Sequence, residues 1–106
     1  MEESFGQIIH RKRLEFGLTL AEVAIRIRSH KGYISGIENE KMKPPSLKFV
    51  KRLARVLALD EIELLVLAHV EKAPLEIRTA LREHAGMIVA RAREYRRAVE
   101  KAAAKA

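Results

Sequence analysis

The chain has 106 residues, enough for one domain with a modest hydrophobic core and a short extension. It contains no cysteine, which excludes a disulfide framework and a thiolate metal site, and no apolar run approaches the roughly 20 residues that span a bilayer. Its 21 Lys and Arg outnumber its 14 Asp and Glu, and the net charge of +7 has the sign expected of a protein that binds a polyanion, although many basic proteins bind none.

The composition favours an all-α protein. The core must come mainly from Leu, Ile, Val and Ala, because the chain has only three phenylalanines, two tyrosines and no tryptophan. Almost no segment alternates apolar and polar residues with the period of a strand. The first residues, MEESFGQ, are acidic and unlike a signal peptide, so together with the lack of cysteine they lead us to expect a cytoplasmic protein.

The first predicted helix begins after Ser4. Ser4 and Gln7 have the spacing of a capping box, in which each side chain binds a free backbone amide near the start of the helix. Apolar residues at helical spacing continue this helix to about Phe16, and Gly17 ends it. We expect its role to be structural.

Residues 19–40 predict two short helices joined by a tight turn. Thr19 and Glu22 form a second capping-box pattern, which starts a helix at about residue 20. The apolar stripe of that helix consists of Leu20, Val23, Ala24 and Ile27. After Ser29 and His30 the apolar positions restart in a new phase, so the chain must change direction there. The apolar positions of the next helix are Tyr33, Ile34 and Ile37.

This two-helix corner resembles a known family. The residues that carry the resemblance are Gly17-Leu18-Thr19, Val23-Ala24, Tyr33-Ile34-Ser35, Ile37-Glu38 and Pro45-Ser46. Together they are similar to the helix-turn-helix of the Xre/Cro/phage-repressor family of DNA-binding proteins, over about residues 5–68. The resemblance implies a domain of five short helices, of which the third, at about residues 30–39, lies in the major groove of DNA.

The same resemblance implies which positions contact bases. The base-facing positions of the third helix are Lys31, Gly32, Ser35 and Gly36. Lysine and serine can hydrogen-bond to base edges, but glycine has no side chain, so we expect few direct base contacts. The two glycines either allow close helix packing or bring the backbone near the groove, where DNA shape would supply specificity.

Phosphate contacts are implied for another set of positions, namely Asn39, Lys41 and Lys43. Such contacts would fix the register of the protein on DNA without reading its sequence. Tyr33 and His30 are two further candidates. For Tyr33 the alternative is core packing, and for His30 it is capping of the third helix.

The resemblance also implies an ion pair that ties the first helix to the third, between Arg13 and Glu38. The alternative is that both are solvated surface charges. The chain departs from the family at Leu20, where glutamine is common, and at Glu40, where glycine is usual. We therefore expect Asn39 to take the left-handed conformation of the turn.

Two more helices complete the predicted domain. Two prolines make residues 40–45 a loop, after which Ser46 is predicted to cap a fourth helix. Asp60 and Glu63 have the capping spacing for a fifth. The fifth helix is apolar nearly all round, so we expect part of it to contact the C-terminal extension or a partner chain.

Pro74 marks a boundary between a helix-turn-helix domain at residues 1–71 and a C-terminal helical extension at residues 72–106. Residues 75–105 predict one long helix, interrupted only by Gly86. A seven-residue apolar repeat predicts a dimer contact through Leu81, Ala85, Ile88, Ala92, Tyr95 and Val99. The alternatives are packing of the extension on its own domain and a frayed, alanine-rich end at residues 101–106.

The extension also carries a basic cluster around Tyr95. Its members are Arg91, Arg93, Arg96 and Arg97. An arginine-rich helix of this kind can add phosphate contacts, bind an acidic protein or simply form a solvated face.

No enzyme motif is visible, and we predict neither a metal nor a cofactor. The histidines, His10, His30, His69 and His84, lack metal-ligand spacing, and there is no glycine-rich phosphate loop. The sequence therefore predicts a sequence-selective DNA-binding transcriptional regulator, specifically a repressor that binds an operator in double-stranded DNA as a homodimer. The alternative is an antitoxin-like or adaptor protein on the same fold, whose C-terminal helix binds a partner protein.

Overall fold

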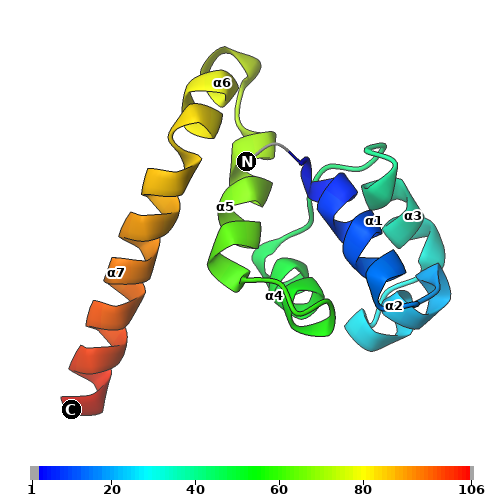
Figure 1. Cartoon of the computed structure of the whole chain (residues 1–106), viewed down its shortest axis with the longest axis horizontal. Coiled ribbons are helices and arrows are strands. Elements are labelled where there is room, and N and C mark those ends of the chain that lie inside the picture. The colour runs from blue at the N-terminus through cyan, green and yellow to red at the C-terminus, as the bar shows by residue number, and fades with distance from the viewer. Residues whose placement is uncertain (1–2, 106) are drawn as a thin grey trace.

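A computed structural model describes residues 3–105, which form seven α-helices and contain no strand, as the all-α prediction requires (Figure 1). The helices are α1 (Phe5–Glu15), α2 (Leu20–Ile27), α3 (Lys31–Glu38), α4 (Leu47–Val56), α5 (Glu61–Lys72), α6 (Leu75–Glu83) and α7 (Ala85–Lys105). Within this part of the chain, no helix has the length and apolar character needed to cross a bilayer. Met1, Glu2 and Ala106, the outermost residues of the two predicted domains, lie outside the described residues.

The predicted helix starts are present, with one difference in detail. Ser4 with Gln7, and Thr19 with Glu22, each form a complete capping box. The Asp60 carboxylate accepts the Glu63 amide at 2.8 Å and caps α5. Ser46 stands at the N-cap of α4, but its hydroxyl makes no capping hydrogen bond.

The turn after α3 differs from the prediction. Glu40, not Asn39, has the left-handed conformation, with φ of 60°, whereas Asn39 has φ of −90°. The Asn39 side chain bonds back to the helix, because its Nδ2 donates to the Ser35 carbonyl at 3.0 Å. The positive φ thus falls one residue later, at the position where the family usually has glycine. It lets the Lys41 amide donate back to the Gly36 carbonyl at 2.9 Å, which ends the helix.

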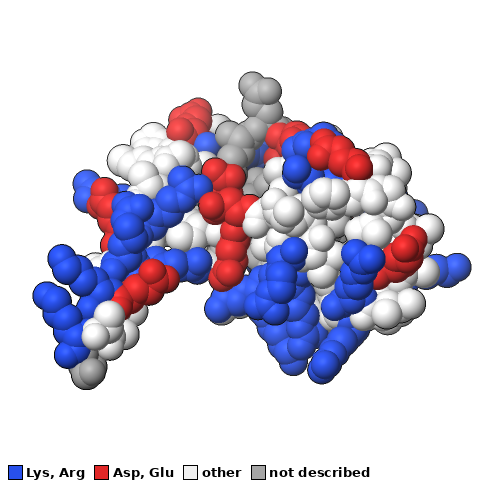
Figure 2. Space-filling view, turned by 60° about the horizontal axis from the view of Figure 1, so that its bottom comes forward, with Lys and Arg blue, Asp and Glu red and all other residues white. Residues whose placement is uncertain are grey.

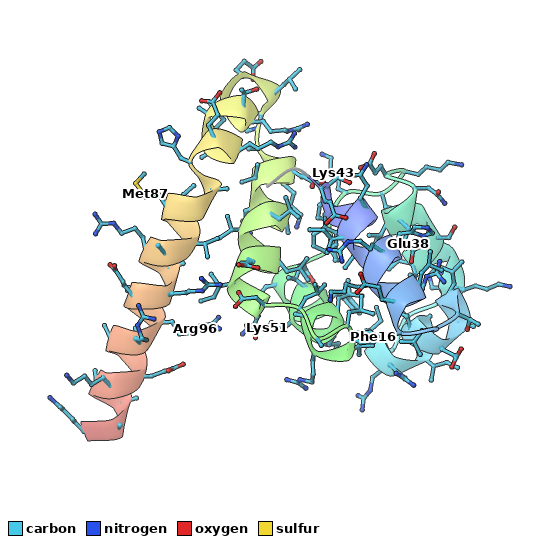
Figure 3. The ribbon with its side chains drawn as sticks, in the orientation of Figure 1. Phe16, Glu38, Lys43, Lys51, Met87 and Arg96 are labelled. Carbon is cyan, nitrogen blue, oxygen red and sulfur yellow. The ribbon has the colours of Figure 1, made fainter. Side chains whose placement is uncertain are left out.

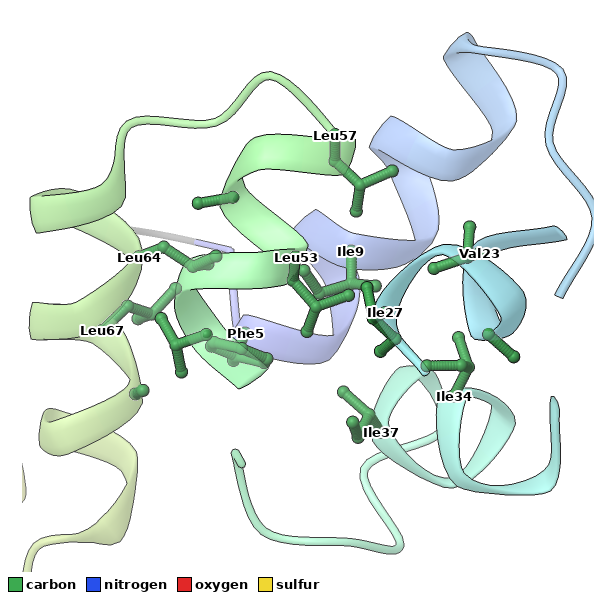
Figure 4. Close-up of a cluster of buried hydrophobic side chains, with 14 residues drawn as sticks. Phe5, Ile9, Val23, Ile27, Ile34, Ile37, Leu53, Leu57, Leu64 and Leu67 are labelled. Atoms are coloured by element: carbon green, nitrogen blue, oxygen red, sulfur yellow. The ribbon is translucent and has the colours of Figure 1, made fainter. Parts of the chain in front are cut away.

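The first five helices enclose one cluster of buried aliphatic side chains (Figure 4). Helices α1 to α3 supply the buried residues Phe5, Ile9, Val23, Ala24, Ile27, Ile34 and Ile37. The residues that follow in the chain supply Val50, Leu53, Ala54, Leu57, Leu64, Leu67 and Ala68. The apolar stripes predicted for the two-helix corner therefore lie on the inner face of this domain.

Helix α1 lies unusually close to α3 at Gly6. A Cβ placed on Gly6 would collide with the Ile37 carbonyl oxygen and lie 3.1 Å from that of Glu38. Glycine is needed here for close approach, because its φ is not in the left-handed region.

Helix α5 is buried on two sides, as its apolar composition predicts. Leu64, Leu67 and Ala68 face the first cluster. A second cluster lies on the other side of α5, where α7 packs; it consists of Ile62, Val66, Val70, Ala85 and Val89. One helix therefore forms a wall shared by both clusters.

The C-terminal extension is two helices and not one, which corrects the prediction of a single helix interrupted at Gly86. The bend lies at His84, and Gly86 is inside the first turn of α7. The position of the bend is explained by burial, because it lays Ala85 and Val89 against α5 with 1% and 5% exposure. A glycine costs a helix only about 1 kcal/mol, less than burying these side chains gains.

The predicted seam of the extension is divided between two environments. Its first four positions pack on α5, which was the alternative to a dimer contact; they are Leu81, Ala85, Ile88 and Ala92. The last two, Tyr95 and Val99, are not part of this cluster and are 73% and 48% exposed.

Ion pairs fix α7 on the start of α5. Arg93 contacts Asp60 at 3.0 Å and Glu63 at 3.1 Å, and Arg96 contacts Glu61 at 3.2 Å (Figure 3). Two arginines of the predicted basic cluster are thus held on their own domain.

Candidate nucleic-acid interface

The start of α3 is an open surface. Lys31 and Gly32 are exposed, and α3 lies on the side of the molecule opposite α7 (Figure 1). Figure 2 shows Lys and Arg gathering in two places, on the extension and on the domain formed by the first five helices, with acidic side chains between them. The C-terminal extension therefore leaves the start of α3 uncovered.

The two glycines of α3 have different surroundings. Around Gly32 the nearest atom to an added Cβ is the His30 ring nitrogen Nδ1 at 3.7 Å, so this part of the surface is open. At Gly36 an added Cβ would lie 2.5 Å from Cγ of Met42, a residue of the following loop. Gly36 thus serves close packing, whereas Gly32 leaves the backbone accessible.

Two predicted contact residues have structural roles. His30 caps α3, because its Nδ1 accepts the Tyr33 amide at 3.3 Å. The Tyr33 ring is half-buried and packs edge-on against Phe49, with 6.2 Å between ring centroids. These are the alternatives named for both residues.

The remaining candidates lie along and just after α3. Ser35 is half-buried, and its hydroxyl accepts from Asn39 Nδ2 at 3.2 Å. Lys41 and Lys43 are exposed on the loop beyond the helix. The structure thus places an exposed lysine, Lys31, at one end of α3 and two at the other.

A cluster of charged side chains fixes α3 to α1. Arg13 donates to Glu38 through Nε at 2.7 Å and Nη2 at 2.9 Å, the two-bond geometry that the resemblance implies. Its Nη1 donates to the Leu18 carbonyl at 2.9 Å. His10 Nδ1 lies 2.7 Å from Oε1 of Glu38, the oxygen that also accepts from Arg13 Nη2 (Figure 3). The Glu38 and Arg13 side chains are only 5% and 11% exposed.

The electrostatics of this cluster favour its charged form. Burial alone raises the pKa of Glu38, but the hydrogen bonds from Arg13 and His10 outweigh burial, and the net pKa is lowered. The hydrogen bond to Glu38 raises the pKa of Arg13. The pair is ionised at neutral pH and fixes the orientation of α3 against α1.

Sequence reasoning missed two members of this region. His10 gave only a weak signal, its position three residues before Arg13 on the same helix face. Met42 gave none, because its contact with Gly36 depends on the path of the loop. Leu20, where the family commonly has glutamine, packs at the edge of the first cluster.

Histidine and carboxylate side chains do not gather into a metal site in residues 3–105, where no group of three could hold an ion. The chemistry available near α3 is hydrogen bonding and positive charge, both suited to a nucleic acid.

Comparison with known proteins also points to nucleic-acid binding. A helix-turn-helix family model matches residues 9–64. The chain is similar to the master regulator for biofilm formation SinR, solved in complex with DNA, with 34% identity over 57% of this chain and 97% of that chain, and a TM-score of 0.53. The N-terminal DNA-binding domain of SinR from Bacillus subtilis has the same identity and TM-score, over 57% of this chain and 88% of that chain.

A complex of the SinR and SinI proteins is similar over a longer stretch, with 32% identity, 74% of this chain and 76% of that chain covered, and a TM-score of 0.54. No curated protein matches the sequence. The family model covers more than half of the chain, and the SinR structures agree with it in fold. The chain therefore belongs to the helix-turn-helix family of Xre/Cro type and is a DNA-binding transcription regulator.

Proposed function

We propose that this protein is a sequence-selective repressor, which binds an operator as a homodimer and places α3 in the major groove of each half-site. The observation that carries the proposal is the open start of α3, with Lys31 and Gly32 exposed on a corner that the buried Arg13–Glu38 pair holds rigid. The similar SinR protein has been solved with DNA, which supports the same use of the fold. Occupying a promoter would block transcription.

The proposed dimer forms through the C-terminal extension. We place the boundary between this extension and the helix-turn-helix domain at about residue 71. A groove of about 300 Å³ lies between α5 and the extension, lined by Leu65, Val66, His69, Val70, Leu81 and Ile88. Tyr95 and Val99 continue this apolar stripe along α7 into solvent. A second copy seated there by twofold symmetry would cover both, and two recognition helices would read half-sites about 34 Å apart.

A mobility-shift assay with duplexes selected from a random pool tests this function. We expect a palindromic consensus and an affinity that falls steeply with salt, because each neutralised phosphate releases counterions. The proposal would be contradicted if no duplex showed salt-sensitive binding, or if the consensus had no twofold symmetry.

Substitutions in and after α3 should separate base reading from phosphate binding. Lys31→Ala is expected to change the base preferred at one position, which corresponds to about 1–3 kcal/mol of discrimination. Lys41→Ala and Lys43→Ala should weaken all sequences evenly and each reduce the salt slope by about 1. Lys105→Ala, at the far end of α7, is the charge-matched control and should change neither. If Lys31→Ala instead weakened binding to all sequences equally, the proposed position of α3 in the major groove would be wrong.

Tyr95→Glu should dissociate the proposed dimer. A carboxylate in the centre of an apolar contact must be desolvated without a partner, which costs far more than the contact gains. Ala90→Glu is the matched control, because Ala90 is exposed on another side of α7. Sedimentation equilibrium should show a monomer for the first variant and a dimer for the second. A dimer in both would exclude this surface.

A second candidate is an antitoxin-like or adaptor protein that binds a partner protein through the extension. It is favoured by the similarity to the SinR/SinI complex and by apolar side chains that remain exposed on α6 and α7, namely Leu75, Ile77 and Met87. Under this alternative, purified protein binds no duplex at low salt, and Leu75→Glu abolishes copurification of the partner while Tyr95→Glu leaves the oligomeric state unchanged.

A further inference from the structure

A polar cavity of about 550 Å³ lies on the side of the domain where the start of α1, the loop after α3 and helix α6 meet. Its volume is within the range of small-molecule sites, about 300–1,000 Å³. The loop supplies Lys41 and Lys43, and α6 supplies Arg78 and Arg82. Figure 3 shows Lys43 near the start of α1. The cavity therefore joins the recognition half of the protein to its extension.

Positive charge in this cavity is not balanced internally. Four cationic side chains line it against two carboxylates, Glu40 and Glu71. Within residues 3–105 none of these four cations forms an ion pair. Arg78 donates through Nε and Nη2 to the Ala73 carbonyl, which positions its guanidinium and leaves Nη1 unused by that contact.

One of the two carboxylates, Glu71, already has a structural partner. Glu71 is half-buried and accepts the Phe5 amide, which fixes it to the start of α1. Burial raises the pKa of Glu71, against the opposing effects of that hydrogen bond and of the nearby positive charges of Arg82 and Arg78. Next to it, Lys72 Nζ donates to the Pro45 carbonyl at 2.8 Å and holds the end of α5 on the loop. These contacts within the protein thus form the wall of the cavity without a ligand.

We propose that this cavity binds a small molecule that carries at least two negative charges on phosphate or carboxylate groups, held between Arg78 and Arg82 on one side and Lys41 and Lys43 on the other. A dianion would neutralise the excess of two positive charges. Guanidinium groups suit both phosphate and carboxylate oxygens, so the two chemistries are distinguished by experiment.

Such a ligand regulates DNA binding, and this step rests on the proposed function. Lys41 and Lys43 are the proposed phosphate contacts, so a bound dianion competes with DNA for the same two side chains. The cavity also contacts Ile37 and Met42, and Met42 packs on Gly36 of the recognition helix. The two ligands must weaken each other by the same factor.

Titration calorimetry of the full chain at constant ionic strength tests the site without DNA. The probes are inorganic phosphate and citrate, with acetate and chloride as monovalent controls. We expect saturable binding of at least one probe, about tenfold weaker in Arg82→Gln and tighter in Glu71→Gln, which removes a negative charge but keeps an acceptor for Phe5. Arg91→Gln, an exposed arginine of α7, should behave as wild type.

The site is excluded if neither probe binds, if acetate binds equally well, or if Arg82→Gln and Arg91→Gln have the same effect. Preference for phosphate over citrate, or the reverse, identifies the ligand chemistry. A mobility shift with the preferred probe then tests regulation: the probe should weaken DNA binding by wild type and not by Arg82→Gln. If no duplex binds at all, the proposed function fails, while the calorimetry still decides the cavity.

Discussion

Gly6→Ala is expected to lower the free energy of unfolding by about 3 kcal/mol, the upper end of typical overpacking costs. A methyl group at Gly6 would meet the backbone carbonyls of Ile37 and Glu38, which cannot turn away as a side chain can. Helix α1 would have to move off α3, and the Arg13–Glu38 pair would be pulled apart. Denaturation in urea, followed by circular dichroism, measures the change.

Gly86→Ala is the matched control for that substitution. Gly86 also lies in the first turn of a helix, but an added Cβ there has no atom within 4 Å. Replacing a helical glycine by alanine should then raise stability by up to about 1 kcal/mol. Opposite signs at the two sites would isolate the effect of the helix contact, and equal signs would mean that α1 and α3 are not in backbone contact.

Glu38→Ala is expected to cost about 3 kcal/mol or more, because it leaves the Arg13 guanidinium buried with no carboxylate. The Glu38 side chain is 5% exposed, so the guanidinium that it pairs with is poorly placed to be solvated by bulk water instead. Replacing both partners by apolar residues, Arg13→Met with Glu38→Leu, should recover much of that loss. Glu15→Ala is the control; it breaks a bridge to Arg11 on the same helix between side chains that are each 46% exposed, and should change stability little.

The same pair should make the protein sensitive to acid. The folded-state pKa of Glu38 is lowered, so its contribution is complete above the ordinary carboxyl pKa of about 4.3 and is lost as pH falls through the lower folded value. In Glu38→Gln the stability at neutral pH should be lower and its decline below pH 4.3 shallower. An unchanged pH profile would mean that the carboxylate is not held by Arg13.

Local patterns were sufficient to predict the helix-turn-helix unit. The capping boxes at Ser4 and Thr19 involve residues three apart, and the change of phase after His30 is visible in a short window. The Arg13–Glu38 pair joins residues 25 apart, and only the family resemblance suggested it.

Features that depend on contacts between distant segments were not predictable in this way. The bend at His84 is set by burial of Ala85 and Val89 on α5, which no pattern within the extension specifies. The cavity that contains Arg78 and Arg82 forms only because α6 folds back toward the loop after α3. The left-handed residue of the turn is Glu40 and not the expected Asn39, because the side-chain amide of Asn39 donates to the Ser35 carbonyl.

The double-sided burial of α5 has a practical consequence for work with isolated domains. A protein shortened at the end of α5 would retain its first cluster but lose the cover over Ile62, Val66 and Val70. These exposed apolar residues would make the shortened molecules self-associate. A shifted band in a gel would then reflect nonspecific aggregation and not recognition of the operator. Aspartate or lysine introduced at these positions would keep such a fragment dispersed and its DNA affinity interpretable.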